Sequence, residues 1–230
     1  MLSTNQIIKS TAATGVNKTP FTKYRKSVKA PTPTMLKPGK NNAKLGGVIQ
    51  KRKWKGLPIY SLTLEERASC PTHCEQWNNC FGNNMPFAHR YDHTHKDFLP
   101  LLGAHIQTLL NKHPQGLVIR LHVLGDFYSP EYVDFWQQQL SIHPTLNAFG
   151  YTHHRATDPI GKQVNLLNES LPDQWRIRFS DDMSQQFRSE VSNRDLPNEV
   201  ICPEQLGKTA SCATCGFCWT SEKPVVFIEH

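Results

Sequence analysis

The sequence predicts an α/β fold with a mainly parallel β-sheet. Segments with strand character and segments with helical periodicity alternate between residues 57 and 228, and such alternation is typical of strands joined by right-handed crossovers. Polar residues also gather where the predicted strands end, which is where parallel sheets bind their ligands. We find no internal sequence repeat in this part of the chain.

The first predicted strand is the short apolar stretch Leu57–Leu62, and a loop with three cysteines at residues 70–80 follows it. His95–Asn111 places apolar residues on one broad face at helical spacing. The turn at His113–Gly116 ends that helix. Leu117–Val123 is then the clearest strand of the chain.

The alternation continues toward the C-terminus. Ser129 followed by Pro130 is typical of a helix start, and this helix should run to about Leu140. Asp126 could also cap this helix. The remaining predicted elements are strands at 147–152, 175–180 and 225–228 and a helix at 160–170.

Seven cysteines fall into two groups, and their odd number argues against full disulfide pairing. The chain has no apolar run long enough to span a bilayer and no signal peptide at its start. We therefore expect a cytoplasmic protein that is not in a membrane. In that compartment clustered cysteines are typical metal ligands.

The C-terminal group lies in a cysteine-rich segment at residues 202–218. It consists of Cys202, Cys212, Cys215 and Cys218. Its C-x2-C-x2-C spacing and the distant Cys-Pro pair are typical of a [4Fe–4S] cluster, because three closely spaced thiolates wrap one cuboidal centre. Zinc is the alternative, since the same four thiolates would complete a closed tetrahedral site.

The first group, Cys70, Cys74 and Cys80, offers three thiolates. A cluster held by three cysteines leaves one iron open to a substrate or cofactor. Alternatively, a nearby histidine completes a Cys3His zinc site. The candidates for that ligand are His73, His89, His93 and His95.

Residues 1–55 hold thirteen Lys and Arg and no Asp or Glu, whereas residues 56–230 hold thirteen Lys and Arg against nineteen Asp and Glu. Prolines and a lack of periodicity predict that residues 1–55 are a disordered tail on a single α/β domain at 56–230. A tail of this kind is typical of a nucleic-acid-binding arm, although a solvated linker could have the same composition. The candidate nucleic-acid contacts are Lys23, Arg25, Lys26, Lys29, Lys51, Arg52, Lys53 and Lys55.

Several motifs resemble the gene product 88 family of phages and mobile elements. They are the run Val118–Tyr132, which contains Gly125-Asp126-Phe127, the strand end at Tyr151-Thr152, and the ending Cys202-Pro…Cys212-x2-Cys215-Gly-Phe-Cys218-Trp219. The resemblance covers about residues 56–220. It implies a phage or mobile-element setting, with the host cytoplasm as the location.

A more distant resemblance is to radical S-adenosylmethionine enzymes. These enzymes place a three-cysteine loop after the first strand of a partial (β/α) barrel and a Gly-Gly-Glu-like motif after the second. Cys70, Cys74 and Cys80 take the first place, with C-x3-C-x5-C rather than C-x3-C-x2-C spacing, and Gly125 and Asp126 take the second. The resemblance implies a partial (β/α) barrel, an electron donor, and S-adenosylmethionine held with the help of Gly125 and Asp126.

The leading hypothesis is therefore an iron–sulfur protein that resembles radical S-adenosylmethionine enzymes and acts on nucleic acid. It would hold one or two [4Fe–4S] clusters, the C-terminal one for electron transfer or stability. The alternative is a non-enzymatic nucleic-acid-binding protein in which zinc or a cluster stabilises the fold.

Overall fold

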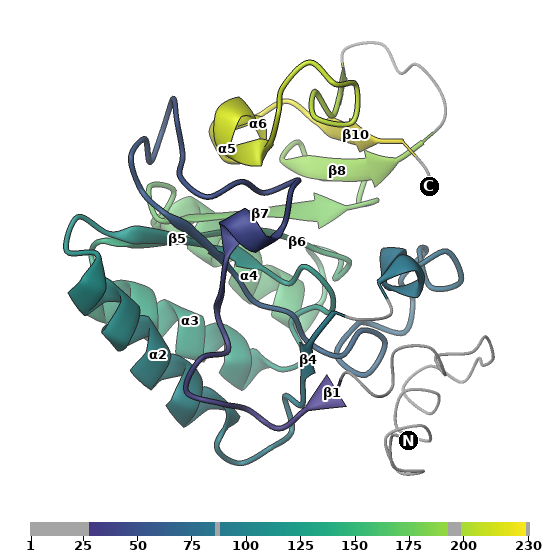
Figure 1. The fold of residues 1–230 in the computed structure, drawn as a ribbon. Helices are drawn as coiled ribbons and strands as arrows, with labels where there is room; N and C mark the ends of the chain where they lie inside the picture. Colours follow the sequence, from purple (N-terminus) through teal and green to yellow (C-terminus); the bar gives the residue numbers. More distant parts are fainter. Residues whose placement is uncertain (1–27, 86–87, 193–198, 229–230) are drawn as a thin grey trace.

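The computed structural model describes residues 28–85, 88–192 and 199–228 (Figure 1). Its main feature is an eight-stranded sheet in the order β2-β3-β5-β6-β7-β8-β10-β9. Every neighbouring pair is parallel except β2 and β3. The predicted α/β fold with a mainly parallel sheet is confirmed. Over the described residues the sheet stays open, with β2 and β9 at its two ends, and does not close into a barrel.

The bounds of the elements are as follows. The large sheet contains β2 (Lys37–Pro38), β3 (Ile59–Ser61), β5 (Leu117–Leu121), β6 (Leu146–Thr152), β7 (Trp175–Ser180), β8 (Arg188–Val191), β9 (Val200–Ile201) and β10 (Val225–Phe227). A separate parallel pair contains β1 (Val28–Lys29) and β4 (Arg90–Tyr91). The helices are α2 (Phe98–Lys112), α3 (Pro130–Ile142), α4 (Pro159–Ser170), α5 (Cys212–Cys215), α6 (Phe217–Thr220), and the 3-10 turns η3 (Gly39–Asn41) and η4 (Phe81–Asn84).

Each strand and helix predicted from periodicity is present, with ends shifted by a few residues. Helix α3 begins at Pro130 as expected, because the Ser129 hydroxyl accepts the backbone N–H of Tyr132. Asp126 is therefore not the cap of this helix. The described helices include none with the length and apolar character that a bilayer crossing requires.

One face of the sheet, which we call the helical face, is covered by α2, α3 and α4 (Figure 1). Alternate side chains of β5, such as Leu117, Ile119 and Leu121, point to this side and join the larger apolar core. The strands β3, β5, β6, β7 and β8 follow one another across the sheet in chain order. The three long helices thus connect neighbouring strands on one side of the sheet.

The opposite face, which we call the cysteine face, is covered by the segment 39–57 and by α5 and α6 (Figure 1). A smaller apolar cluster fills the layer beneath them. It consists of Leu45, Ile49, Ile59, Val118, Phe149, Ala213 and Trp219. Trp54 stacks on Trp219 with ring centres 5.9 Å apart, so the two covering segments also pack on each other.

The prediction of a disordered tail over residues 1–55 is wrong for residues 28–55. Met35 and Leu36 are buried in the larger core, and Leu45 and Ile49 are buried in the smaller one. These apolar residues are few and lie among lysines, prolines and glycines, so composition concealed them, whereas their burial against the sheet offsets the entropy of ordering the chain. Residues 1–27, on which the rest of that prediction falls, lie outside the described residues.

Candidate functional site

Both cysteine groups line one pocket of about 300 Å³ on the cysteine face, near the carboxyl ends of the parallel strands. Six of the seven cysteines contribute to its wall, namely Cys70, Cys74, Cys80, Cys202, Cys212 and Cys218. Gly125, His153 and Asp181, which follow β5, β6 and β7, line it too. The predicted gathering of polar strand ends is therefore present, and the two cysteine groups share it.

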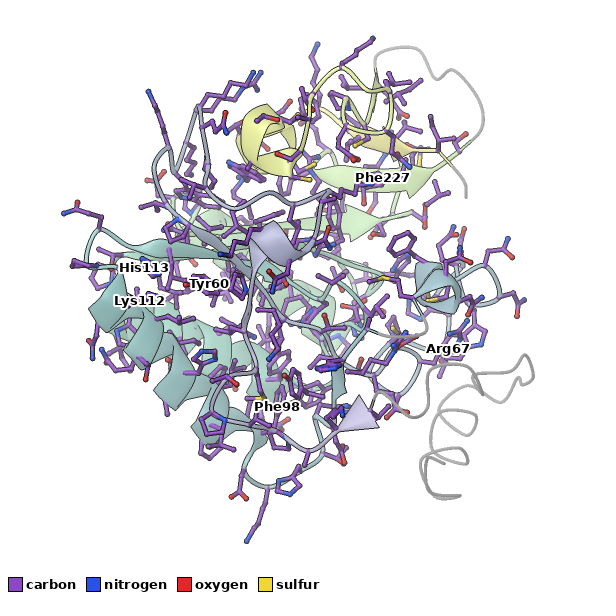
Figure 2. All side chains as sticks on the ribbon, in the orientation of Figure 1. Tyr60, Arg67, Phe98, Lys112, His113 and Phe227 are labelled. Atoms are coloured by element: carbon purple, nitrogen blue, oxygen red, sulfur yellow. The ribbon has the colours of Figure 1, made fainter. Side chains whose placement is uncertain are left out.

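Two buried arginines hold the loop that carries the first cysteine group. Arg90 forms a two-pronged ion pair with Glu66, with donor–acceptor distances of 2.6 and 2.9 Å. Arg67 donates to the carbonyl oxygen of Trp77 at 2.7 Å and to the side chain of Asn83. These contacts cross the loop and fix it, because charge-assisted hydrogen bonds are short and strong in a buried setting. Figure 2 labels Arg67 beside this loop and Phe227 of β10, which lines the pocket from the other side.

Asp126 ties this loop to the ends of β5 and β6. Its carboxylate accepts the backbone N–H of Phe127 and that of His153, each at 2.7 Å. Its own backbone N–H donates to the hydroxyl of Ser69, directly before the first cysteine. The side chain is almost wholly buried. Asp126 therefore positions the pocket wall, and its two oxygens already accept backbone hydrogen bonds.

Gly125 lines the pocket in a conformation that only glycine adopts easily, with a φ of +87°. A Cβ atom added there would stand 2.6 Å from the Ser69 hydroxyl and 2.7 Å from Cβ of Leu64. The close approach of the strand end to the loop therefore requires a glycine at this position.

The histidine that contacts the first cysteine group is His153, at the end of β6. Its Nε2 lies 3.4 Å from Oδ2 of Asp181. Burial lowers the pKa of His153, but its close contacts with Asp181 and Cys74 raise it more, to about 10. His153 is therefore an imidazolium at neutral pH and faces the thiol of Cys74.

Three of the four histidines proposed as zinc ligands have other contacts, and the fourth, His89, is exposed. The ring of His73 hydrogen bonds to the backbone carbonyl of His153 at 3.0 Å. The ring of His93 packs on that of Tyr128 with centres 4.4 Å apart, and His95 lies 3.7 Å from Asp97.

Strands β5 and β6 contribute two further pocket residues that the sequence analysis missed, Arg120 and Tyr151. The guanidinium carbon of Arg120 lies 4.6 Å from the centre of the Tyr151 ring. Tyr151 hydrogen bonds to the thiol of Cys218, which acts to lower the pKa of that thiol. A signal was present in the sequence, because a strand buried on both faces is normally apolar throughout and Arg120 interrupts one.

Arg178 of β7 holds the C-terminal cysteine segment against the sheet. Its guanidinium donates to the backbone carbonyls of Cys218, Arg188, Lys223 and Ser221 at 2.5 to 3.0 Å. Helix α5 is further fixed by a capping box between Ser211 and Thr214. The chain turns between α5 and α6 at Gly216, with a φ of +68°.

Within each group the thiols are close enough to influence one another. Burial raises the pKa of Cys70 well above its usual value, and the neighbouring Cys74, Asp126 and Cys80 raise it further. Burial and the carboxylate of Glu66 raise the pKa of Cys80 to about 11.

In the second group, burial again raises the pKa of Cys212 and Cys218, and Arg178 and Tyr151 oppose part of the rise at Cys218. These thiols are therefore protonated at neutral pH in the metal-free chain, and metal binding would displace the protons.

The donor chemistry of both groups suits iron–sulfur clusters or zinc, which select soft thiolate ligands. All seven cysteines are free thiols. Over the described ranges, no three side chains of His, Cys, Asp or Glu converge closely enough to hold a single metal ion.

The proposed nucleic-acid contacts are divided between the described and the remaining residues. Lys23, Arg25 and Lys26 lie outside the described residues. Lys29, Lys51, Arg52 and Lys55 are exposed. Lys53 packs against the folded domain, because its amino group pairs with Asp173 at 3.1 Å and lies over the ring of Trp54.

The sheet and its pocket define an α/β protein with a cysteine-lined cavity opposite its crossover helices. A family model described as gene product 88 matches residues 34–221, and the chain therefore belongs to the gene product 88 family. The predicted resemblance to this phage family is confirmed. The match begins at residue 34, which agrees with the folded state of the segment before residue 56.

Among curated proteins, the chain is similar to the gene 88 protein of Mycobacterium phage L5, with 27% identity over 128 residues. The aligned region covers 48% of this chain and 54% of the relative, so the similarity spans about half of each protein. No solved structure matches the chain significantly. The more distant resemblance to radical S-adenosylmethionine enzymes remains a prediction.

Proposed function

We propose that the protein is an iron–sulfur protein whose pocket combines cluster chemistry with a substrate site. The observation that carries this proposal is that six cysteines from two distant parts of the chain line a single pocket. Partly buried free thiols at this density have no packing role that smaller apolar side chains could not fill. Their shared location is what a cofactor-binding pocket requires.

Cys70, Cys74 and Cys80 would hold a [4Fe–4S] cluster with one open iron. Cys202, Cys212, Cys215 and Cys218 would hold a second one. When bound, the first cluster would supply one electron to a ligand such as S-adenosylmethionine. A separate electron donor would then reduce the cluster again. The chain itself supplies the fixed loop, through Arg67 and Arg90, and a wall that restricts water.

The winding of the sheet supports the comparison with a partial (β/α) barrel. Neighbouring parallel strands follow in chain order, and their crossover helices lie on one face, as in (β/α) barrels and unlike doubly wound sheets. The cysteine loop follows β3, and Gly125 follows β5. We infer that Asp126 supports a cofactor indirectly, by holding His153 and the residue before Cys70, because its oxygens already accept backbone N–H groups.

We propose nucleic acid as the substrate class. The protein would meet it in the cytoplasm of a phage host. The support for it is the basic N-terminal quarter of the chain, together with the exposed Lys51 and Lys55 in the turn beside the C-terminal segment. This part of the proposal is independent of the metal content. It can fail while the iron–sulfur assignment stands.

The test is the content of iron, acid-labile sulfide and zinc in anaerobically purified full-length protein, with its visible absorption spectrum. We expect about eight iron and eight sulfide per chain for two clusters, or about four of each for one. Serine substitution of Cys70, Cys74 and Cys80 together should remove about four irons. Thr72→Ala, in the same loop and exposed, should remove none. Zinc without sulfide would overturn the proposal in favour of a zinc-stabilised nucleic-acid-binding protein.

A further inference from the structure

The charged side chains that line the pocket are paired, with one exception. Lys44 lies 3.4 Å from Glu204, and His153 lies 3.4 Å from Asp181. Two acidic lining residues also have cationic partners. Glu66 pairs with Arg90, and Glu190 with Arg188. Among the described residues, Arg120 has no carboxylate within ion-pair distance.

Arg120 also differs from the other arginines inside the protein. Arg67 and Arg178 have their guanidinium donors taken up by carbonyl and amide oxygens, and Arg176 pairs with Glu222. Arg120 donates to the carbonyl of Leu121 next to it, and its other described contacts are the faces of two rings, Tyr151 and Phe149. A guanidinium has five N–H donors, so most of those of Arg120 have no protein acceptor among the described residues.

The position of this side chain points to a ligand. Arg120 lies on β5 and lines the pocket to which both cysteine groups contribute, near enough to Cys212 and Cys218 to feel their charges. The rings of Tyr151 and Phe149 hold the guanidinium in place, with its central carbon 4.6 and 5.8 Å from their centres. A cation in a partly dry cavity is costly without an anion, and a held guanidinium plane is suited to two parallel hydrogen bonds with an oxyanion.

We propose that Arg120 is the anion-binding residue of this pocket and takes a carboxylate or phosphate group of the ligand that enters between the two cysteine groups. This inference rests on the proposed function, since it names the ligand class of the same pocket. A cysteine-ligated cluster carries negative charge as well, so the test must separate a bound anion from simple charge balance.

The test measures thermal unfolding of the anaerobically purified full-length protein against increasing inorganic phosphate or acetate, with chloride keeping the ionic strength constant. An anion that binds the folded state raises the unfolding midpoint in a saturable way. Arg120→Gln should weaken the apparent affinity about tenfold or more, and Arg120→Lys should weaken it less. Lys112→Gln is the control, because it removes the same charge from the exposed end of α2 (Figure 2).

Each outcome decides the question. Saturation by phosphate alone, by acetate alone or by both, lost in Arg120→Gln and kept in Lys112→Gln, supports the inference and identifies the oxyanion. No saturation in the wild type, or an unchanged response in Arg120→Gln, overturns it. Loss of iron and sulfide from a folded Arg120→Gln or Arg120→Lys variant also overturns it, because Arg120 would then balance the cluster. Anion binding lost in Arg120→Gln from a chain without iron would support the inference while the proposed function fails.

Discussion

The two faces of the sheet are built from the same strands but differ sharply in chemistry. On the helical face, β7 contributes Trp175, Ile177 and Phe179, which pack in the larger core. On the cysteine face, the same strand contributes Arg176 and Arg178. A parallel sheet buried on both sides is normally apolar on both. The charged residues therefore distinguish the cysteine face, where backbone carbonyls, thiols and a pocket adjoin a smaller apolar cluster.

The largest expected effect comes from the helical face. Ile177→Ala should lower the free energy of unfolding by about 3–4 kcal/mol, because it leaves a cavity in a fully buried core. Ile177→Val is the matched control and should cost about 1 kcal/mol. Urea unfolding at neutral pH measures both. A loss of less than about 1 kcal/mol for the alanine variant would mean that this face is less tightly packed than the structure indicates.

The neighbouring residue offers the corresponding test of the cysteine face. Arg178→Met should lower the free energy of unfolding by about 2–3 kcal/mol, because it leaves several buried carbonyl groups without their donor. Hydrogen exchange should accelerate in residues 212–223, and metal content per folded chain should fall. Ile177→Ala should leave the metal content of the folded fraction unchanged. If both variants lost metal equally, the two faces would not be separable.

The helical face could be predicted from the sequence because its signals are local. Helix periodicity, the Ser129-Pro130 start and the turn at His113–Gly116 each lie within one element. The gathering of polar strand ends could also be predicted, because parallel strands bring their carboxyl ends to one edge of the sheet once the strands themselves are recognised.

The cysteine face depends on contacts between distant segments. Strand β10 inserts between β8 and β9, and Arg178 binds carbonyls of Ser221 and Lys223, more than forty residues away in the chain. The sharing of one pocket by Cys70 and Cys218 follows from that packing, and no spacing rule encodes it. The segment 28–55 was mistaken for a tail because its few buried residues show no helical or strand periodicity and are covered only by distant parts of the chain.

A buried histidine makes the helical face sensitive to acid. Burial lowers the pKa of His122 well below its usual value, and the charge of Arg120 adds to the effect. The unfolded chain therefore binds a proton below pH about 6.5 that the folded chain does not, so stability falls as the pH drops through that value. The slope from one such group is at most about 1.4 kcal/mol per pH unit.

His122→Asn should reduce the loss of stability between pH 7 and pH 5.5 by about 1 kcal/mol. Asparagine tolerates the positive φ of 53° at this position. The measurement is urea unfolding at the two pH values, with the exposed His95→Asn as the control. An equal pH response in the wild type and in His122→Asn would assign the acid sensitivity elsewhere.

The smallest expected effect on stability lies at the outer edge of the cysteine face, in the basic turn that covers it. Lys51 and Lys55 are exposed there, while Lys53 pairs with Asp173. Lys51→Gln with Lys55→Gln should change the free energy of unfolding by less than about 0.5 kcal/mol and leave the metal content unchanged.

The same double substitution should reduce the salt dependence of DNA or RNA binding by nearly two counterions, since each lysine that contacts a phosphate releases about one counterion. Lys53→Gln should instead cost stability through its ion pair, by about 0.5 kcal/mol. A salt dependence that stays constant in the double variant would confine any nucleic-acid contact to other residues, and the turn would then serve only to pack on the C-terminal segment.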